Sequence, residues 1–331
     1  MDGKAALRQP VGERAPRVLR RTPRGARGRR FSLAVLPTAL LLLAVVSAGY
    51  GAKAGPTSLH PRKTVPVILA AGDIASCDSD GDEATARLIQ RLPGTVAALG
   101  DEAYDDGSSD NFANCYAPSW GRFLARTRPT PGNHDYQTPD AAGYFGYFDG
   151  LAGPPGKGWY SYRLGTWHIV VINSNCSDVG GCGVGSPQAR WLRSDLAANR
   201  ALCTLAYWHH PRFSSGTEHG SDKEMAPIWK LLYTAGADVV LNGHEHNYER
   251  FAPQTPSGKL DVAHGIREFV VGTGGKSHYE DFATPIANSQ VRNGDTFGVL
   301  RVALKNRGYS WTFMPTEPGG FTDSGSSKCH S

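Results

Sequence analysis

Short apolar runs of strand length alternate with helical patterns from residue 65 to the end of the chain. Such runs predict strands at 67–71, 96–99, 167–172, 204–208, 237–241, 266–271, 297–304 and 309–313. An aromatic, alternating run at 159–164 predicts one more strand, which pairs with 167–172 as a hairpin across Gly165-Thr166. This order of elements predicts a layered α/β fold with mixed sheets, organised as one domain over 65–331.

Helical signals separate several of these strands. A helix is predicted for 83–92, with Asp82 as its N-cap. A second is predicted for 187–199, where Ser186 can cap the helix and Pro187 can occupy its first position. A third is predicted for 223–233, between the strands at 204–208 and 237–241.

The first 54 residues differ from the rest of the chain. Residues 1–30 hold ten Lys and Arg against two acidic residues, and an apolar run follows at 31–48. A basic arm, an apolar core and then small residues form the layout of an export signal, with cleavage expected after Ala48 or Ala54. The apolar run is also near the minimum for spanning a bilayer, so an uncleaved anchor is the alternative. Both alternatives predict a secreted or extracytoplasmic protein.

The formal charge of +5 comes from this basic arm. Residues 55–331 hold 24 basic and 28 acidic residues, a net charge of −4. A mildly acidic body argues against nucleic acid as the main partner. The 40% of apolar residues also exceeds what a low-complexity disordered protein would carry, so most of the chain is expected to be globular.

The six cysteines support export, because disulfides persist in oxidising compartments. Cys176 and Cys182 flank a flexible Val179-Gly180-Gly181 turn, so a local bridge is expected between them. Fifteen pairings are possible for six cysteines, and sequence alone does not choose among them. The pairs Cys77–Cys115 and Cys203–Cys329 are the remaining predictions.

Polar residues follow the ends of the predicted strands and segments at five places. These are Gly72-Asp73, Gly100-Asp101 with Tyr104, Gly132-Asn133-His134-Asp135, His209-His210, and Gly243-His244-Glu245-His246. Open α/β sheets bind ligands at the carboxyl ends of their strands. Oxygen and nitrogen donors without a thiolate suit zinc, iron or manganese, and a cation would offset the converging carboxylates. His244 and His246 are two residues apart, so on a regular strand they are expected to face the same side.

This ordered set resembles the calcineurin-like metallophosphoesterases. The stretch Gly100-Asp101-x-x-Tyr104 narrows the resemblance to the purple acid phosphatase branch, in the compact exported bacterial form. Most other branches have an Asp-x-His motif where this chain has Asp73 followed by Ala75, and Tyr104 would replace the ligand that Ala75 cannot supply. The resemblance implies an α/β/β/α sandwich of two mixed sheets flanked by helices.

The resemblance also implies a two-metal centre. The first metal, ferric iron in that branch, would be bound by Asp73, Asp101, Tyr104 and His246. Asp101 would bridge to the second metal (zinc, manganese or ferrous iron), whose site would be completed by Asn133, His209 and His244. His134 matches a residue that contacts the substrate phosphate, and His219 lies about where the family has a further substrate-contacting histidine. Asp135 is expected either to orient His134 or to cap a loop.

The implied function is hydrolysis of phosphate esters, above all monoesters, by a metal-bound hydroxide at the two-metal centre. A phosphodiesterase or nucleotidase on the same centre is one alternative. A non-catalytic surface binding protein is the other, and its expected sign, a lost ligand, is not found among the seven positions. The implied partner is a phosphorylated small molecule, selected by loops at 105–119 and 213–222. The sequence gives no oligomeric state.

Overall fold

The computed structural model describes residues 64–330, which belong to one compact unit, Pro61–Ser331. The predicted export signal or anchor at 1–54, with its two cleavage sites, lies outside the described residues. Within residues 64–330, no helix is both long enough and apolar enough to cross a membrane.

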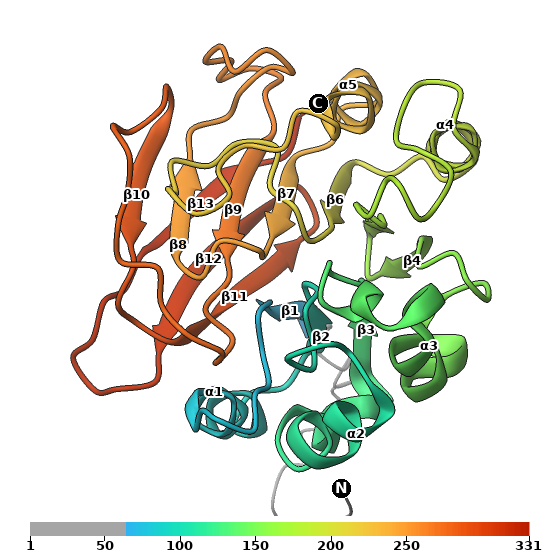
Figure 1. Ribbon diagram of the computed structural model, residues 1–331. Coiled ribbons are helices and arrows are strands. Elements are labelled where there is room, and N and C mark those ends of the chain that lie inside the picture. Colours follow the sequence, from blue (N-terminus) through green and yellow to red (C-terminus); the bar gives the residue numbers. More distant parts are fainter. Residues whose placement is uncertain (1–63, 331) are drawn as a thin grey trace, which may run out of the picture. The chain divides into compact units, whose positions relative to one another are not determined.

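The first of two sheets contains six strands in the order β13-β12-β11-β1-β2-β3 (Figure 1). Its strands are β1 (Val67–Ala71), β2 (Thr95–Ala98), β3 (Thr127–Pro129), β11 (Gly298–Lys305), β12 (Gly308–Pro315) and β13 (Ser324–Lys328). β1, β2 and β3 run parallel to one another, so their carboxyl ends lie at the same edge of the sheet. The other three strands are added antiparallel, starting with β11 beside β1.

The second sheet contains seven strands in the order β10-β8-β9-β7-β6-β5-β4. Its strands are β4 (Tyr160–Leu164), β5 (Trp167–Val171), β6 (Cys203–Tyr207), β7 (Val239–Asn242), β8 (Tyr248–Phe251), β9 (Arg267–Val271) and β10 (Ser289–Asn293). β5, β6, β7 and β9 are parallel, and β4, β8 and β10 are antiparallel to their neighbours. Both sheets are therefore mixed, as predicted.

Helices flank the two sheets. They are α1 (Gly81–Gln90), α2 (Ser109–Asn111), α3 (Ala142–Phe148), α4 (Pro187–Ala198) and α5 (Ala226–Thr234). Short helical turns occur at Phe112–Tyr116, Trp120–Arg126, Asp135–Gln137, Pro139–Ala141 and Asp149–Ala152. α1 packs on β11, whereas α4 and α5 pack against each other on the side of the seven-stranded sheet (Figure 1). The predicted sandwich of two mixed sheets flanked by helices is confirmed.

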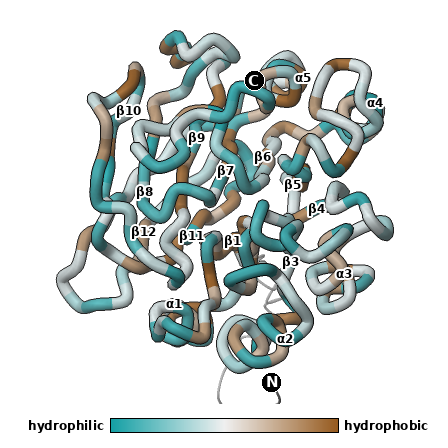
Figure 2. The backbone as a smooth tube through the Cα atoms, in the orientation of Figure 1, coloured by the Kyte–Doolittle hydropathy of each residue, from teal (hydrophilic) through white to brown (hydrophobic). Residues whose placement is uncertain are grey.

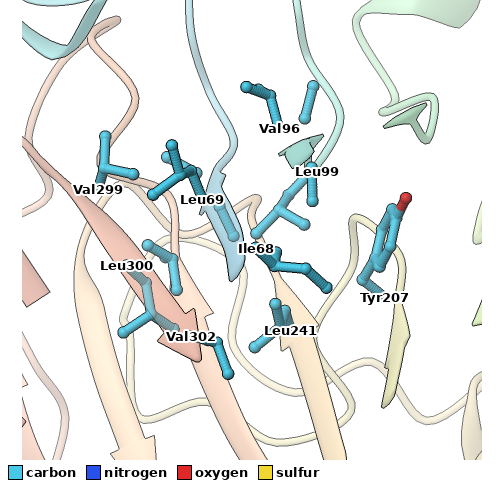
Figure 3. Packing of buried hydrophobic residues seen from close by; sticks show 14 of the residues in the cluster. Ile68, Leu69, Val96, Leu99, Tyr207, Leu241, Val299, Leu300 and Val302 are labelled. Atoms are coloured by element: carbon cyan, nitrogen blue, oxygen red, sulfur yellow. The ribbon is translucent and has the colours of Figure 1, made fainter. Parts of the chain in front are cut away.

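The main core lies between the sheets and joins apolar side chains from both. Figure 3 shows Ile68 of β1 beside Leu241 and Tyr207 from the second sheet. Figure 2 colours the backbone by hydropathy. The core strands β1 and β11 are hydrophobic, whereas α1 is largely hydrophilic. Full burial of one such large apolar side chain contributes about 1.5–3 kcal/mol.

Alternate side chains of β5 belong to two different apolar clusters. Ile169 belongs to the core between the sheets, and its neighbour Val170 belongs to a second cluster with Leu192 of α4 and Trp229 of α5. Successive residues of a strand point to opposite faces, so one apolar strand packs against a sheet on one side and helices on the other.

The predicted strands agree with the observed ones to within two residues, and the predicted hairpin is present as β4 and β5. The prediction that Asp82 caps the first helix is wrong, because the helix begins at Gly81 and the capping position is Asp80. The backbone N–H of Gly81 donates to Ser79 Oγ at 3.1 Å, so one N–H group of the first turn is satisfied without Asp82. At α4 the predicted cap is confirmed, since Ser186 accepts from the N–H of Ala189.

All three predicted disulfides are confirmed. Cys77–Cys115, Cys176–Cys182 and Cys203–Cys329 have Cα–Cα distances of 4.9, 5.2 and 5.5 Å, and none of the described cysteines is free. The third bridge spans 126 residues and joins β6 to the end of the described chain, just after β13. It therefore ties the two sheets together covalently.

Removing this long-range bridge is expected to destabilise the protein more than removing the local one. In the chain-entropy account, Cys203→Ser with Cys329→Ser should lower the free energy of unfolding by about 5 kcal/mol, and Cys176→Ser with Cys182→Ser by about 2 kcal/mol. Urea unfolding of the two double variants measures both values. A larger loss for the local pair would contradict the expected order.

Candidate metal centre

The loops that follow five parallel strands bring the predicted ligands together. Asp73 lies two residues after β1, Asp101 three after β2 and Asn133 four after β3. In the second sheet, His209 and His244 each lie two residues after the ends of β6 and β7. The two sheets therefore present the carboxyl ends of their parallel strands to one shared site, as predicted.

Three of these residues form a buried cluster. Asp73, Asp101 and His209 each offer a ligand atom within 4.8 Å of the others, and all three are at most 1% exposed. His209 Nε2 lies 3.3 Å from Asp101 Oδ2 and 4.0 Å from Asp73 Oδ1. His246 extends the cluster, because its Nε2 lies 3.3 Å from Asp73 Oδ1.

In each carboxylate, one oxygen is held by a backbone N–H and the other faces the cluster. Asp73 Oδ2 accepts from the N–H of His244, and Asp101 Oδ1 accepts from the N–H of His134, both at 2.8 Å. Asp73 Oδ1 and Asp101 Oδ2 are the oxygens that remain for a shared partner. The backbone thus fixes the orientation of both side chains before any ligand binds.

The rings of His209 and His246 are also held, each through a hydrogen bond at Nδ1. His209 Nδ1 donates to the carbonyl of Leu99 at 2.8 Å, and His246 Nδ1 lies 2.7 Å from Ser277 Oγ. A proton on Nδ1 leaves Nε2 with a lone pair directed at the cluster, and such outer contacts typically orient metal-binding histidines. Electron-pair donors therefore converge on one place from four side chains.

The Tyr104 hydroxyl lies beside the side chains of Asp73, Asp101 and His246. Its hydroxyl oxygen is 3.1 Å from Asp73 Oδ1, 3.0 Å from Asp101 Oδ2 and 3.1 Å from His246 Nε2. Burial, followed by the charges of Asp101 and Asp73, raises the pKa of Tyr104 well above its usual value. A phenolate at this position would therefore need a cation beside it.

The residues predicted for a second metal adjoin the first group through His209. Asn133 Oδ1 lies 3.2 Å from His209 Nε2, and His244 Nδ1 lies 3.2 Å from the same atom. Asn133 and His244 are thus on the open side of the cluster, beyond the buried carboxylates. The structure brings all seven predicted ligand residues into one connected set.

His244 and His246 do not lie on a regular strand. β7 ends at Asn242, and residues 243–247 form a bent loop. The φ angle of His244 is 74°, and those of Asp73 and Asp101 are 59° and 51°. Left-handed backbone at three non-glycine positions costs free energy and is concentrated at functional sites. The two histidines meet the cluster through this bend rather than through strand alternation.

The charge balance of the site fits a cation. Burial works against a proton on His209, but the charges of Asp101 and Asp73 outweigh it and raise the pKa of His209 to about 9. Burial and the charge on His209 lower the pKa of His244 well below its usual value. The two carboxylates therefore require a positive charge at this point, and a metal ion among the converging lone pairs would supply it.

Gly132 and Gly243 leave space for the carboxylates of this cluster. A Cβ on Gly132 would lie 2.0 Å from Asp101 Oδ1 and 2.4 Å from the Asp101 nitrogen. A Cβ on Gly243 would lie 2.7 Å from Asp73 Oδ2. The loops can approach the carboxylates this closely only without a side chain, which is a physical reason for the Gly-Asn and Gly-His pairs.

Gly132→Ala is expected to displace Asp101 and to weaken metal binding by about 10- to 100-fold, as loss of an orienting contact does at metal sites. Titration of the metal-free protein with zinc measures the change. Gly146→Ala is the matched control, because a Cβ there meets no atom within 4 Å. Equal zinc affinity in both variants would contradict the role of Gly132.

His134 is half-buried beside the cluster. Its ring lies 4.5 Å from the Tyr104 ring, and its Nδ1 lies 2.5 Å from the backbone oxygen of Asp105. The contacts of Asp135 support the loop-capping alternative, since its Oδ2 accepts from the N–H groups of Gly132 and Asp101. Among residues 64–330, Asp135 makes no side-chain hydrogen bond to the His134 ring.

The remaining histidines near the site have different surroundings. The exposed ring of His219 stacks on His244 at 4.0 Å, and its N–H donates to the buried Glu245. Burial and the charge on His209 lower the pKa of His210 to about 3. His210 packs on His244 at 4.3 Å, and its Nδ1 lies 2.7 Å from Ser174 Oγ.

Sequence reasoning missed the contribution of residues 276–279. Ser277 holds the His246 ring, and Tyr279 stacks on that ring at 4.1 Å with an interplanar angle of 6°. Lys276 Nζ lies 4.9 Å from the centre of the Tyr104 ring. The only local signal was a glycine-rich turn, which carries no indication that it lies beside loops more than 150 residues away.

The sequence is similar to the sequences of known proteins. Purple acid phosphatase 15 of Arabidopsis thaliana is 27% identical over 264 residues, covering 66% of this chain and 48% of that protein. A nucleotide pyrophosphatase/phosphodiesterase of Hordeum vulgare is 25% identical over 331 residues, covering 83% of this chain and 86% of the relative. The chain thus spans about half the length of the first relative and most of the second.

Solved structures support the fold. Purple acid phosphatase PPD1 from yellow lupin (Lupinus luteus) seeds superimposes with a TM-score of 0.65 at 19% identity, covering 81% of this chain and 55% of that one. The family model for calcineurin-like phosphoesterases matches residues 66–248, which is more than half of the chain. The chain therefore belongs to the calcineurin-like phosphoesterase family.

Proposed function

We propose that the protein is a metal-dependent phosphoric ester hydrolase of the purple acid phosphatase type, acting mainly on phosphate monoesters. The observation that carries this proposal is the position of the Tyr104 hydroxyl, within 3.1 Å of Asp73, Asp101 and His246 side-chain atoms. Ala75 cannot bind a metal, so the phenol supplies the donor that would otherwise be missing from this group.

In this proposal the seven residues divide between two metals. Asp73, Asp101, Tyr104 and His246 would hold the first, ferric iron. Asn133, His209 and His244 would hold the second (zinc, manganese or ferrous iron), and Asp101 would be shared between the two. When bound, the two cations offset phosphoryl charge and activate water for an in-line displacement.

The chain's own residues bind and orient the substrate. His134 Nδ1 contacts both the Asp105 carbonyl at 2.5 Å and Gln137 Nε2 at 3.0 Å, so Nε2 is the ring nitrogen that remains available to a phosphoryl oxygen. A protonated His134 would stabilise the charge that develops on that oxygen. His219, exposed and stacked on His244, is placed to contact the substrate beyond the second metal.

A phosphodiesterase or nucleotide pyrophosphatase is the second candidate. It is favoured by the barley relative of that name, which aligns over most of both chains. The same metal ligands would serve either reaction, so the choice depends on the loops around the site at 105–119 and 213–222.

Hydrolysis of matched substrates separates the two candidates. The purified metal-loaded protein is assayed with p-nitrophenyl phosphate and with bis-p-nitrophenyl phosphate, and its metal content is measured on the same sample. The proposal predicts a higher kcat/KM for the monoester. A higher value for the diester would favour the second candidate, and hydrolysis of neither substrate by protein with both sites filled would refute the proposal.

We further propose that one catalytic domain, residues 65–331, works outside the cytoplasm on a phosphorylated small molecule. Three disulfides support an oxidising location. The segment 31–48 would serve either as a cleaved signal peptide or as a membrane tether. Mass spectrometry of the natively exported protein identifies its N-terminus and counts its free thiols, and six free thiols would contradict this location.

A further inference from the structure

Lys276 links the loops of the two sheets beside the candidate metal centre. It lies on the loop after β9, and its backbone N–H donates to the carbonyl of Asp73 at 3.0 Å. Its Nζ donates to Ser76 Oγ at 3.1 Å and to Asp105 Oδ1 at 2.9 Å. The Lys276 side chain is 23% exposed, and these two hydrogen bonds hold its ammonium group.

Asp105 connects Lys276 to His134, because its carboxylate contacts Lys276 and its backbone oxygen contacts the His134 ring. Its side chain is 74% exposed and forms an ion pair with Lys276, whereas its backbone oxygen accepts from His134 Nδ1. Among residues 64–330, Lys276 is the only cationic partner of the Asp105 carboxylate. Two residues thus contact His134 Nδ1, Gln137 at 3.0 Å and Asp105, and Asp105 is itself held by Lys276.

The Tyr104 ring lies within this group. Its centre is 4.9 Å from Lys276 Nζ and 4.5 Å from the centre of the His134 ring. An ammonium group at this distance is attracted to the ring, which adds to the ion pair with Asp105. Lys276, Asp105 and His134 thus surround the tyrosine that reaches the metal ligands.

We propose that Lys276 is a positioning residue, which holds the Asp105 segment so that the Asp105 carbonyl keeps the His134 ring in its place beside the cluster. The inference rests on the proposed function, because His134 matters to turnover only if the site hydrolyses phosphoesters. Misplacement of a catalytic group by about 1 Å can cost on the order of 10²-fold in rate, so a distant anchor can control turnover.

Lys276→Met removes the charge and both hydrogen bonds while keeping a side chain of similar length. We expect kcat for p-nitrophenyl phosphate to fall by about 10- to 100-fold, as for loss of an outer contact at a metal site. KM, metal content and melting temperature are expected to change little. Lys276→Arg should restore most of kcat, because its guanidinium can pair with the Asp105 carboxylate.

Lys157→Met is the matched control. Lys157 also lies over an aromatic ring, 5.3 Å from the centre of Trp159, but no ion pair or hydrogen bond joins its ammonium group to Asp105 or His134. Its kcat should equal that of the unmodified protein. A fall in kcat equal to that of Lys276→Met would show that loss of any such lysine has this effect and would overturn the proposal.

A double-mutant cycle shows whether Lys276 acts through His134. In a His134→Ala background, Lys276→Met should lower kcat no further, because the group that it positions is gone. A full additional fall would mean that Lys276 acts on the substrate or the metals directly, and would overturn the proposal. Loss of metal or of melting temperature in Lys276→Met alone would show a merely structural role and would overturn it as well.

A spectroscopic readout keeps the inference separate from the proposed activity. In zinc-loaded protein with ¹⁵N-labelled histidine, the His134 ring should give an NMR signal that disappears in His134→Ala. We expect Lys276→Met to lose or shift that signal and Lys276→Arg to retain it. An unchanged signal in Lys276→Met refutes the positioning role, whereas failure of the proposed function would appear as an inactive unmodified protein with the signal present.

Discussion

Replacing His244 with alanine is expected to lower metal content and phosphatase activity together. His244 Nδ1 lies 3.2 Å from His209 Nε2 on the open side of the cluster, where the second metal is proposed. Without this donor the cation is under-coordinated and exchanges with solvent. Activity should fall by more than the roughly 10²–10³-fold that removal of a single oxyanion donor costs.

His134→Ala is the matched comparison for this prediction. The His134 ring touches Asp105 and Tyr104, but it is not among the proposed ligands, so both metals should stay bound. We expect kcat to fall by about 10²–10³-fold with metal content unchanged. Elemental analysis measures the metal content of both variants, and steady-state kinetics measures their kcat. Metal loss in His134→Ala as large as in His244→Ala would contradict the assigned roles.

Tyr104→Phe is expected to abolish visible colour in the iron-loaded protein. A phenolate is a hard, anionic donor that suits ferric iron, and a ferric phenolate absorbs visible light by charge transfer. The raised pKa of Tyr104 means that the phenolate forms only beside a strong cation. The variant should lose the absorption band and keep the metal held by Asn133, His209 and His244.

Tyr279→Phe serves as the control for this change. Tyr279 also lies beside the site, stacked on His246, but among the described residues its hydroxyl makes no hydrogen bond to the proposed ligands. Its colour should match that of the unmodified protein. A colourless and fully active unmodified enzyme with two zinc or manganese ions would contradict the ferric assignment.

Most of the strands that the sequence predicted have a continuous apolar composition. β1 has the sequence VILAA and all five residues are buried, so its pattern stands out from its surroundings. Four strands were missed. β3 has only three residues, β8 reads YERF, β10 reads SQVRN and β13 reads SGSSK. The polar strands β10 and β13 lie at the edges of their sheets, and their pairing depends on neighbouring strands rather than on their own burial.

The candidate site was easier to predict than the shapes of its loops. Asp73 and Asp101 follow apolar strands directly, so strand ends locate them. The bend that presents His244 and His246 could not be predicted, because the left-handed backbone of His244 is imposed by tertiary contacts such as its N–H to Asp73. Lys276 could not be predicted either, since its contacts join the loops of two different sheets.

Anomalous X-ray scattering from a crystal of the metal-loaded protein locates the proposed metals. We expect two metal peaks about 3.5–4 Å apart. One peak should lie within bonding distance of Tyr104, Asp73 and His246, and the other near Asn133 and His244, with Asp101 between them. A single peak, or a Tyr104 oxygen beyond bonding distance of either metal in the active enzyme, would contradict it.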